Sequence, residues 1–145
     1  MSAAAELRLV GAGGEPVDFA RTIVSHGVAE LPPNRVDPAA RALETTLPVA
    51  RGARTVRITE RRAMLHVEGS ADRGLVQTVA HMFRLDEDLS AFYELVRESD
   101  LSWCATGAGR MLRAPTVFED VVKTNWTPIR MISRLCSSAQ NLRYS

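Results

Sequence analysis

The sequence predicts an α+β protein in which an antiparallel sheet packs against two to three helices. Strand-like runs gather in the first half of the chain, and amphipathic helices follow them, which is the order typical of α+β folds. The 145 residues are 46% hydrophobic and 24% charged. This is ordinary globular composition, with enough chain for one domain with its own core and part of another.

Four runs have the residue pattern of strands. Glu6–Val10 alternates polar and apolar residues, as a half-buried strand does. Three further runs follow closely, at Ala42–Leu47, Thr55–Thr59 and Arg62–Glu68. Glu60-Arg61 is expected to form a tight hairpin turn, although it lacks the usual Asn-Gly chemistry. The pattern predicts a meander that covers one layer of helices.

Apolar stripes at helical spacing predict three helices before residue 100, at Phe19–His26, Leu75–Phe83 and Leu89–Val96. Asp18 is expected to cap the first helix, and Asp86 or Asp88 the third. The stretch Asp100–Ala114 lacks a period and is interpreted as a connector. Pro115-Thr116 then begins another helix, and Ile129, Ile132 and Leu135 suggest a further short one.

A glycine-rich turn, Gly11–Pro16, follows the first strand. It invites comparison with a dinucleotide-binding loop. That fingerprint needs a third glycine opening a helix, whereas this chain has Pro16 there and no βαβ unit after it. The segment is therefore interpreted as a plain turn.

Basic residues are concentrated in one part of the chain, although the net charge of the whole is only +1. Residues 35–62 contain seven arginines and three acidic residues, which leaves a local charge of +4. Two interpretations stay open. The stretch is either the solvated outer face of a sheet or a surface that contacts nucleic-acid phosphates. No aromatic residues interleave with the arginines, which argues against a stacking platform for single strands.

The residues alone indicate no catalytic or metal site. His26, His66 and His81 have no partner at ligand spacing, so no metal is expected. Cys104 is interpreted as a small buried residue, and the two cysteines of the chain as reduced thiols. The adjacent acids Glu119 and Asp120 fit the first turn of a helix better than an acid–base pair. No cofactor is expected.

The segment Gly109–Thr124 carries a family resemblance. Its turn, Leu112-Arg113-Ala114-Pro115, leads into a helix that contains Phe118-Glu119. This resembles the start of the catalytic domain in helix-hairpin-helix (HhH-GPD) DNA glycosylases, and the preceding order of elements resembles their amino-terminal domain. The resemblance covers roughly residues 6–135. It implies an α+β domain at residues 1–108 and, at residues 109–145, the first helices of an incomplete all-α domain.

The resemblance also implies a function. Members of the family remove damaged bases by cleaving the N-glycosidic bond of a flipped nucleotide. Their hairpin and catalytic aspartate lie well downstream of the Phe-Glu helix, whereas this chain has no aspartate after Asp120. We therefore expect the N-terminal portion of a base-excision-repair glycosylase acting on double-stranded DNA, without catalytic competence by itself. Whether the chain is itself an enzyme is left open.

Five residues are the candidate DNA contacts: Arg110, Arg113, Lys123, Asn125 and Arg57. The cations would contact backbone phosphates, and Asn125 is the nearest candidate for the residue that wedges into the DNA stack. The expected partner is double-stranded DNA, with binding weak or lost in this fragment, and the chain is expected to be a monomer. No secretory signal and no long apolar run occur, so a bacterial cytoplasmic location near the nucleoid and no membrane contact are expected.

Two alternatives remain. The chain could be a stand-alone α+β module that binds DNA or a protein without enzymatic activity. It could also be a non-functional truncation product with an exposed apolar face that is prone to aggregate. Salt-dependent binding distinguishes a phosphate contact from an apolar protein contact, and cooperative unfolding distinguishes both from the third possibility.

Overall fold

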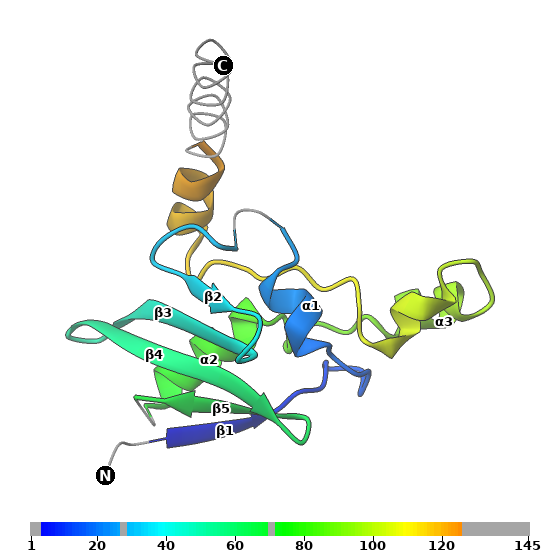
Figure 1. Cartoon of the computed structure of the whole chain (residues 1–145), viewed down its shortest axis with the longest axis horizontal. Coiled ribbons are helices and arrows are strands. Elements are labelled where there is room, and N and C mark those ends of the chain that lie inside the picture. Colours follow the sequence, from blue (N-terminus) through cyan, green and yellow to red (C-terminus); the bar gives the residue numbers. More distant parts are fainter. Residues whose placement is uncertain (1–3, 27–28, 70–71, 126–145) are drawn as a thin grey trace, which may run out of the picture. The chain divides into compact units, whose positions relative to one another are not determined.

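The computed structural model describes residues 4–26, 29–69 and 72–125. The chain divides into two compact units, residues 1–115 and 116–145. In its described part, the first unit holds a five-stranded antiparallel sheet, three α-helices and a short 3-10 helix (Figure 1). The predicted α+β class is confirmed. The boundary between the two compact units follows Pro115. The sequence predicts a domain boundary after residue 108, and this boundary stays a prediction.

The sheet is built around a three-stranded meander with a short strand at each edge. In spatial order its strands are β1 (Ala4–Arg8), β5 (Met64–Glu68), β4 (Gly52–Arg61), β3 (Ala42–Val49) and β2 (Arg35–Asp37). The predicted meander is confirmed as β3–β4–β5, and the predicted first strand as β1, two residues earlier than expected. The edge strand β2 was not predicted, because three residues are too few to reveal a period of two.

The turn between β4 and β5 differs from the expected one. Arg61 still pairs with Met64, so the strands continue past the predicted turn at Glu60-Arg61. The chain reverses instead at Arg62 and Ala63, whose φ angles are 53° and 57°. A two-residue hairpin of this kind needs positive φ at both central residues. Neither residue is a glycine or asparagine, so the sequence carries no signal for this position.

One face of the sheet forms the main core. Alternate residues of the central strands point to this face and are buried: Leu43, Leu47, Val56, Ile58, Leu65 and Val67. Helix α2 (Arg73–Met82) lies against this face, behind the sheet in Figure 1. Helix α1 (Phe19–Ile23) contributes to the same core, where Phe19 stacks on Phe83 with ring centroids 5.5 Å apart.

Side-chain caps begin the first two helices. Asp18 accepts the backbone N–H of Arg21 at 3.0 Å, which confirms the expected cap of α1. Asp72 accepts the N–H of Leu75 at 3.0 Å at the start of α2. Helix α1 ends at Ile23 rather than His26, and α2 covers the predicted apolar stripe except Phe83, which is its C-cap.

Helix α3 (Ser90–Arg97) begins without the predicted cap. Leu89 occupies its N-cap position, and no side chain accepts a capping hydrogen bond there. Asp88 instead accepts the N–H of Ser90 at 2.9 Å, and Asp86 binds His81 at 3.1 Å. The prediction that Asp86 or Asp88 caps the helix was therefore wrong. The helix starts one residue later than a cap at Asp88 requires, and the N–H of Leu89, which occupies the N-cap position, donates to the Glu15 carboxylate at 2.7 Å.

A second, smaller core lies between α3 and the 3-10 helix Ser102–Thr106. It consists of Tyr93, Val96, Cys104 and Ala108. The Tyr93 hydroxyl donates to the Ala108 carbonyl at 2.7 Å. Burial raises the pKa of Tyr93, although the charge of Arg110 partly opposes this rise. Cys104 is a buried free thiol, as predicted.

The second unit begins with a helix at residues 117–125. Val117 and Phe118 are 80% and 78% exposed, and Lys123 pairs with Glu119 at 2.6 Å within the same helix. The further helix predicted around Ile129–Leu135 lies outside the described residues. None of the helices in the described segments has the length and apolar character that crossing a membrane requires.

Candidate nucleic-acid interface

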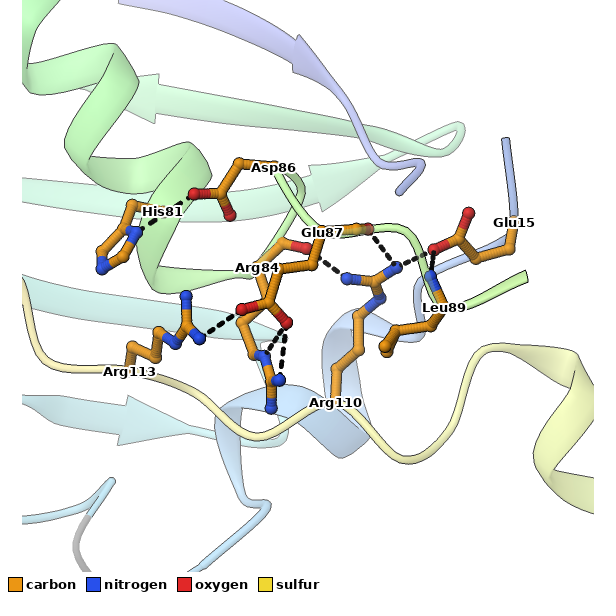
Figure 2. Close-up of polar contacts among 8 residues, drawn as sticks. All are labelled: Glu15, His81, Arg84, Asp86, Glu87, Leu89, Arg110 and Arg113. Carbon is orange, nitrogen blue, oxygen red and sulfur yellow. Dashed lines mark hydrogen bonds and ion pairs between the residues drawn. The ribbon is translucent and has the colours of Figure 1, made fainter. Parts of the chain in front are cut away.

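The most deeply buried charges of the first unit form one cluster beside α2 (Figure 2). Arg110 is 2% exposed and forms an ion pair with Glu15, which is 6% exposed. The same guanidinium donates to the backbone carbonyls of Arg84 and Glu87. A buried charge is tolerated only when it is paired and hydrogen-bonded. This arginine therefore has a structural role in the described conformation.

The glycine-rich turn makes room for this pair. The Gly11 N–H donates to the Glu15 carbonyl at 2.9 Å, and the Gly14 N–H donates to the Gly11 carbonyl at 3.0 Å. A methyl group on Gly11 would overlap both the Arg110 guanidinium and the Glu15 carboxylate. The predicted plain turn is confirmed, and its glycine explains how two charged side chains approach the backbone so closely.

The link between α2 and α3 supplies the other half of the cluster. Glu87 accepts from Arg84 at 2.6 Å and also pairs with Arg113, while the Leu89 N–H donates to Glu15 at 2.7 Å. Partial burial raises the pKa of Glu87, but the hydrogen bonds and charges of Arg84 and Arg113 outweigh it and lower the pKa below the ordinary 4.5. The carboxylate is thus held in its charged form.

Residues 110–113 form a strap that crosses the ends of α1 and α2. The Leu112 N–H donates to the Ser25 hydroxyl at 3.0 Å, and the Leu112 carbonyl is 2.9 Å from the His26 ring. The Arg113 N–H donates to the Met82 carbonyl at 2.9 Å. The sequence predicts a connector here, and the structure adds that this connector is fixed to the core along its length.

The structure brings two of the five predicted DNA contacts together. Arg110 and Arg113 both contact Glu87. Arg110 donates to the backbone carbonyl of Glu87, and Arg113 pairs with the Glu87 carboxylate. The side chain of Arg113 is one-third exposed, so part of it faces solvent. Arg110 is occupied by protein partners and presents no free guanidinium in this conformation. Its phosphate contact stays a prediction that this burial does not favour.

The other three predicted contacts lie elsewhere. Arg57 is exposed on the sheet face opposite the core, and Glu44 and Glu68 are its partners on the neighbouring strands. In the second unit, Lys123 is buried and paired with Glu119, and the Asn125 side chain donates to the Val121 carbonyl at 2.9 Å. Their roles in DNA binding stay predictions.

Sequence reasoning missed Glu15 and Glu87 as members of the cluster. Glu15 is separated from Arg110 by most of the first unit, so no local pattern connects the two residues. A weak signal was present, because two glycines beside a single acid are typical of a turn that approaches another group closely. The residue type alone could not identify that group as an arginine.

The clustered side chains neutralise one another, so this arrangement can position the chain but offers no free acid, base or nucleophile. Each histidine already has a polar partner: Leu112 for His26, Glu6 for His66 and Asp86 for His81. Within residues 4–26, 29–69 and 72–125, no three His, Cys, Asp or Glu residues gather as metal ligands.

Comparison with protein-family models, with curated proteins and with solved structures found no match to this chain. The residues and geometry of the chain itself are therefore the basis for a proposed function.

Proposed function

We propose that this chain is the N-terminal, DNA-contacting portion of a base-excision-repair glycosylase of the HhH-GPD type. In this role it contributes contacts with double-stranded DNA and does not itself cleave the glycosidic bond. The observation that carries the proposal is the order of parts. An α+β unit is followed by a fixed strap, which includes Leu112 and Arg113, and then directly by the helix that contains Phe118-Glu119.

Two features of the first unit support contact with DNA. Within this unit, the main core covers one face of the sheet, and exposed charged side chains occupy the other face. Many of these are arginines, whose guanidinium groups form paired hydrogen bonds with phosphate oxygens. Such contacts give affinity without sequence preference, which suits a protein part that holds duplex DNA while another part selects the base.

A binding assay on the whole chain tests the proposal. Affinity for lesion-containing and lesion-free duplexes would be measured at about 50 mM and about 200 mM salt, alongside base release from the same duplexes. We expect binding that weakens steeply with salt and no base release. Binding that does not depend on salt would contradict the DNA contact. Release of a damaged base would contradict the non-catalytic role.

A stand-alone module that binds a protein is the second candidate. Val117, Phe118 and Val121 leave apolar surface exposed on the helix at residues 117–125, and exposed apolar patches are typical of contact sites. The same assay separates the candidates. A module that uses only an apolar protein contact should show no salt-dependent binding to DNA.

A further inference from the structure

The exposed sheet face has two ends with different charge arrangements. At one end, a row of residues in register across four strands runs Glu68, Arg57, Glu44, Arg35. Each arginine in this row has a carboxylate on a neighbouring strand, and Arg35 lies 3.9 Å from Glu44. Side chains in register lie close enough to interact. The positive charge of this end is therefore largely compensated.

The opposite end carries arginines that lack such compensation. Arg8 on β1 and Arg61 on β4 are in register with Met64, one on either side of it, and Arg62 follows in the turn. All three arginines are exposed. No hydrogen bond or ion pair joins their side chains to another residue in the described part of the chain. We call these three residues the arginine end.

The other arginines of residues 35–62 differ from these. Arg41 pairs with Glu60, and Arg54 donates to the Gly69 carbonyl at 3.2 Å. Arg51 stands by itself in the turn between β3 and β4. Among the described arginines of this stretch, two consecutive arginines without an ion pair occur only at the arginine end, where Arg8 of β1 lies across Met64 from Arg61.

The surface at the arginine end is also hollowed. Glu6, Arg61, Arg62, Met64 and His66 line a depression of about 420 Å³. Its one carboxylate, on Glu6, lies 3.1 Å from the His66 ring. Adjacent strands are about 4.8 Å apart, so Arg8 and Arg61 leave the sheet about 10 Å from each other. Two long side chains at this separation can meet at one phosphate group above Met64.

We propose that the arginine end binds phosphates of the duplex DNA backbone. This inference rests on the proposed function and deepens it, because it names the surface that makes the contact. It also reassigns the contact on the sheet from Arg57 to Arg8, Arg61 and Arg62. Charge complementarity selects the occupant, since a polyanion gains most where several cations have no protein partner.

A matched pair of double variants in the whole chain tests this assignment. The first is Arg8→Ala with Arg61→Ala, and the comparison variant is Arg35→Ala with Arg57→Ala. Each removes one arginine from an edge strand and one from β4, so both lower the net charge equally. Affinity for a lesion-free duplex would be measured at about 50 mM and about 200 mM salt, and folding would be checked by thermal unfolding.

We expect the Arg8/Arg61 variant to lose roughly tenfold in affinity. The slope of the logarithm of its affinity against the logarithm of salt concentration should be shallower by about one for each phosphate contact removed. The comparison variant should lose less than about twofold, because its arginines have carboxylate neighbours. Equal losses in both variants, or a larger loss in the comparison variant, would overturn the assignment and leave the proposed function standing.

Two further outcomes have distinct meanings. If the unaltered chain does not bind the duplex, the proposed function and this inference both fall. Vesicles containing anionic lipid provide the second arm, because their headgroups also present phosphates. If vesicles bind more tightly than the duplex, and binding depends on Arg8 and Arg61, the surface recognises phosphate but the choice of DNA is overturned. Reversing one charge with Arg61→Glu should weaken duplex binding more than Arg61→Ala does.

Discussion

Arg110 shows how a single residue type can have different roles according to its surroundings. In the sequence it is one arginine among many and a natural candidate for a phosphate contact. In the structure it is buried against Glu15, and its guanidinium holds backbone carbonyls of the link between α2 and α3. Charged groups removed from water in this way stabilise the fold only as a pair.

Replacing Arg110 should therefore destabilise the protein strongly. We expect Arg110→Ala to lower the free energy of unfolding by about 3–5 kcal/mol, because Glu15 would remain buried without its cation. Urea unfolding would measure the change. The exposed Arg51→Ala is the control, with an expected effect within about 0.5 kcal/mol. A loss below about 1 kcal/mol for Arg110→Ala would mean that the pair is not a main support of the fold.

Glu87 predicts a dependence of stability on pH. Its pKa is lowered in the folded protein, so folding favours the charged carboxylate. This contribution is present above the ordinary pKa of 4.5 and is lost as the pH falls through the lower folded value. As the pH is lowered from about 5 to about 3, the midpoint temperature of unfolding should fall, and it should fall less steeply in Glu87→Gln. Equal slopes in the two proteins would contradict this origin.

At the scale of elements, the reversal between β4 and β5 is the feature least apparent in the sequence. Arg62 and Ala63 both adopt positive φ, although neither is a residue that favours it. The pairing of Arg61 with Met64 and the burial of Leu65 on the core face fix the register. A shift of one residue would turn every side chain of β5 to the wrong face. Because the register is fixed, Arg62 and Ala63 adopt an unfavourable backbone conformation in the turn.

A glycine at the second turn position should relieve this cost. We expect Ala63→Gly to raise the free energy of unfolding by up to about 1 kcal/mol, because an L-residue loses roughly 1–2 kcal/mol at positive φ. Ala53→Gly is the matched control, since Ala53 is also exposed and lies in β4 with ordinary backbone geometry. There, glycine should cost roughly 0.5–1 kcal/mol. Chemical denaturation would measure the free energy of unfolding of both variants. A change of the same sign in both would contradict this explanation.

At the scale of the whole molecule, the two units differ in how well they bury apolar side chains. The first has a continuous core between the sheet and two helices. In the helix at residues 117–125, Val117, Phe118 and Val121 are exposed. Each large apolar side chain left in water forfeits roughly 1.5–3 kcal/mol of possible burial energy. Local stability should therefore be unequal along the chain.

Hydrogen exchange measures this difference directly. We expect amides of residues 117–125 to exchange much faster than those of α2, because α2 is packed against the sheet by Leu75, Val79 and Met82. A protein contact that covers the exposed helix would slow its exchange. Equal protection of the two helices in the isolated chain would contradict the prediction.

The sequence by itself determined the fold class, the meander and the presence of the three α-helices in the described part of the first unit. These features depend on local chemistry: alternation in β3–β5, apolar stripes in α2 and α3, and a cap at Asp18. It also located the connector and the arginine-rich stretch. Such signals are repeated over many residues, so a single exception does not remove them.

Only the tertiary structure decided which charged residues are free and which are paired. Glu15 and Arg110 meet across most of the first unit, and Arg57 has carboxylates on both neighbouring strands. Arg8 is far in sequence from the consecutive pair Arg61 and Arg62, and it lies near them only because β1 lies beside β5. Electrostatic roles depend on distance and burial in space, which neither residue type nor spacing along the chain can supply.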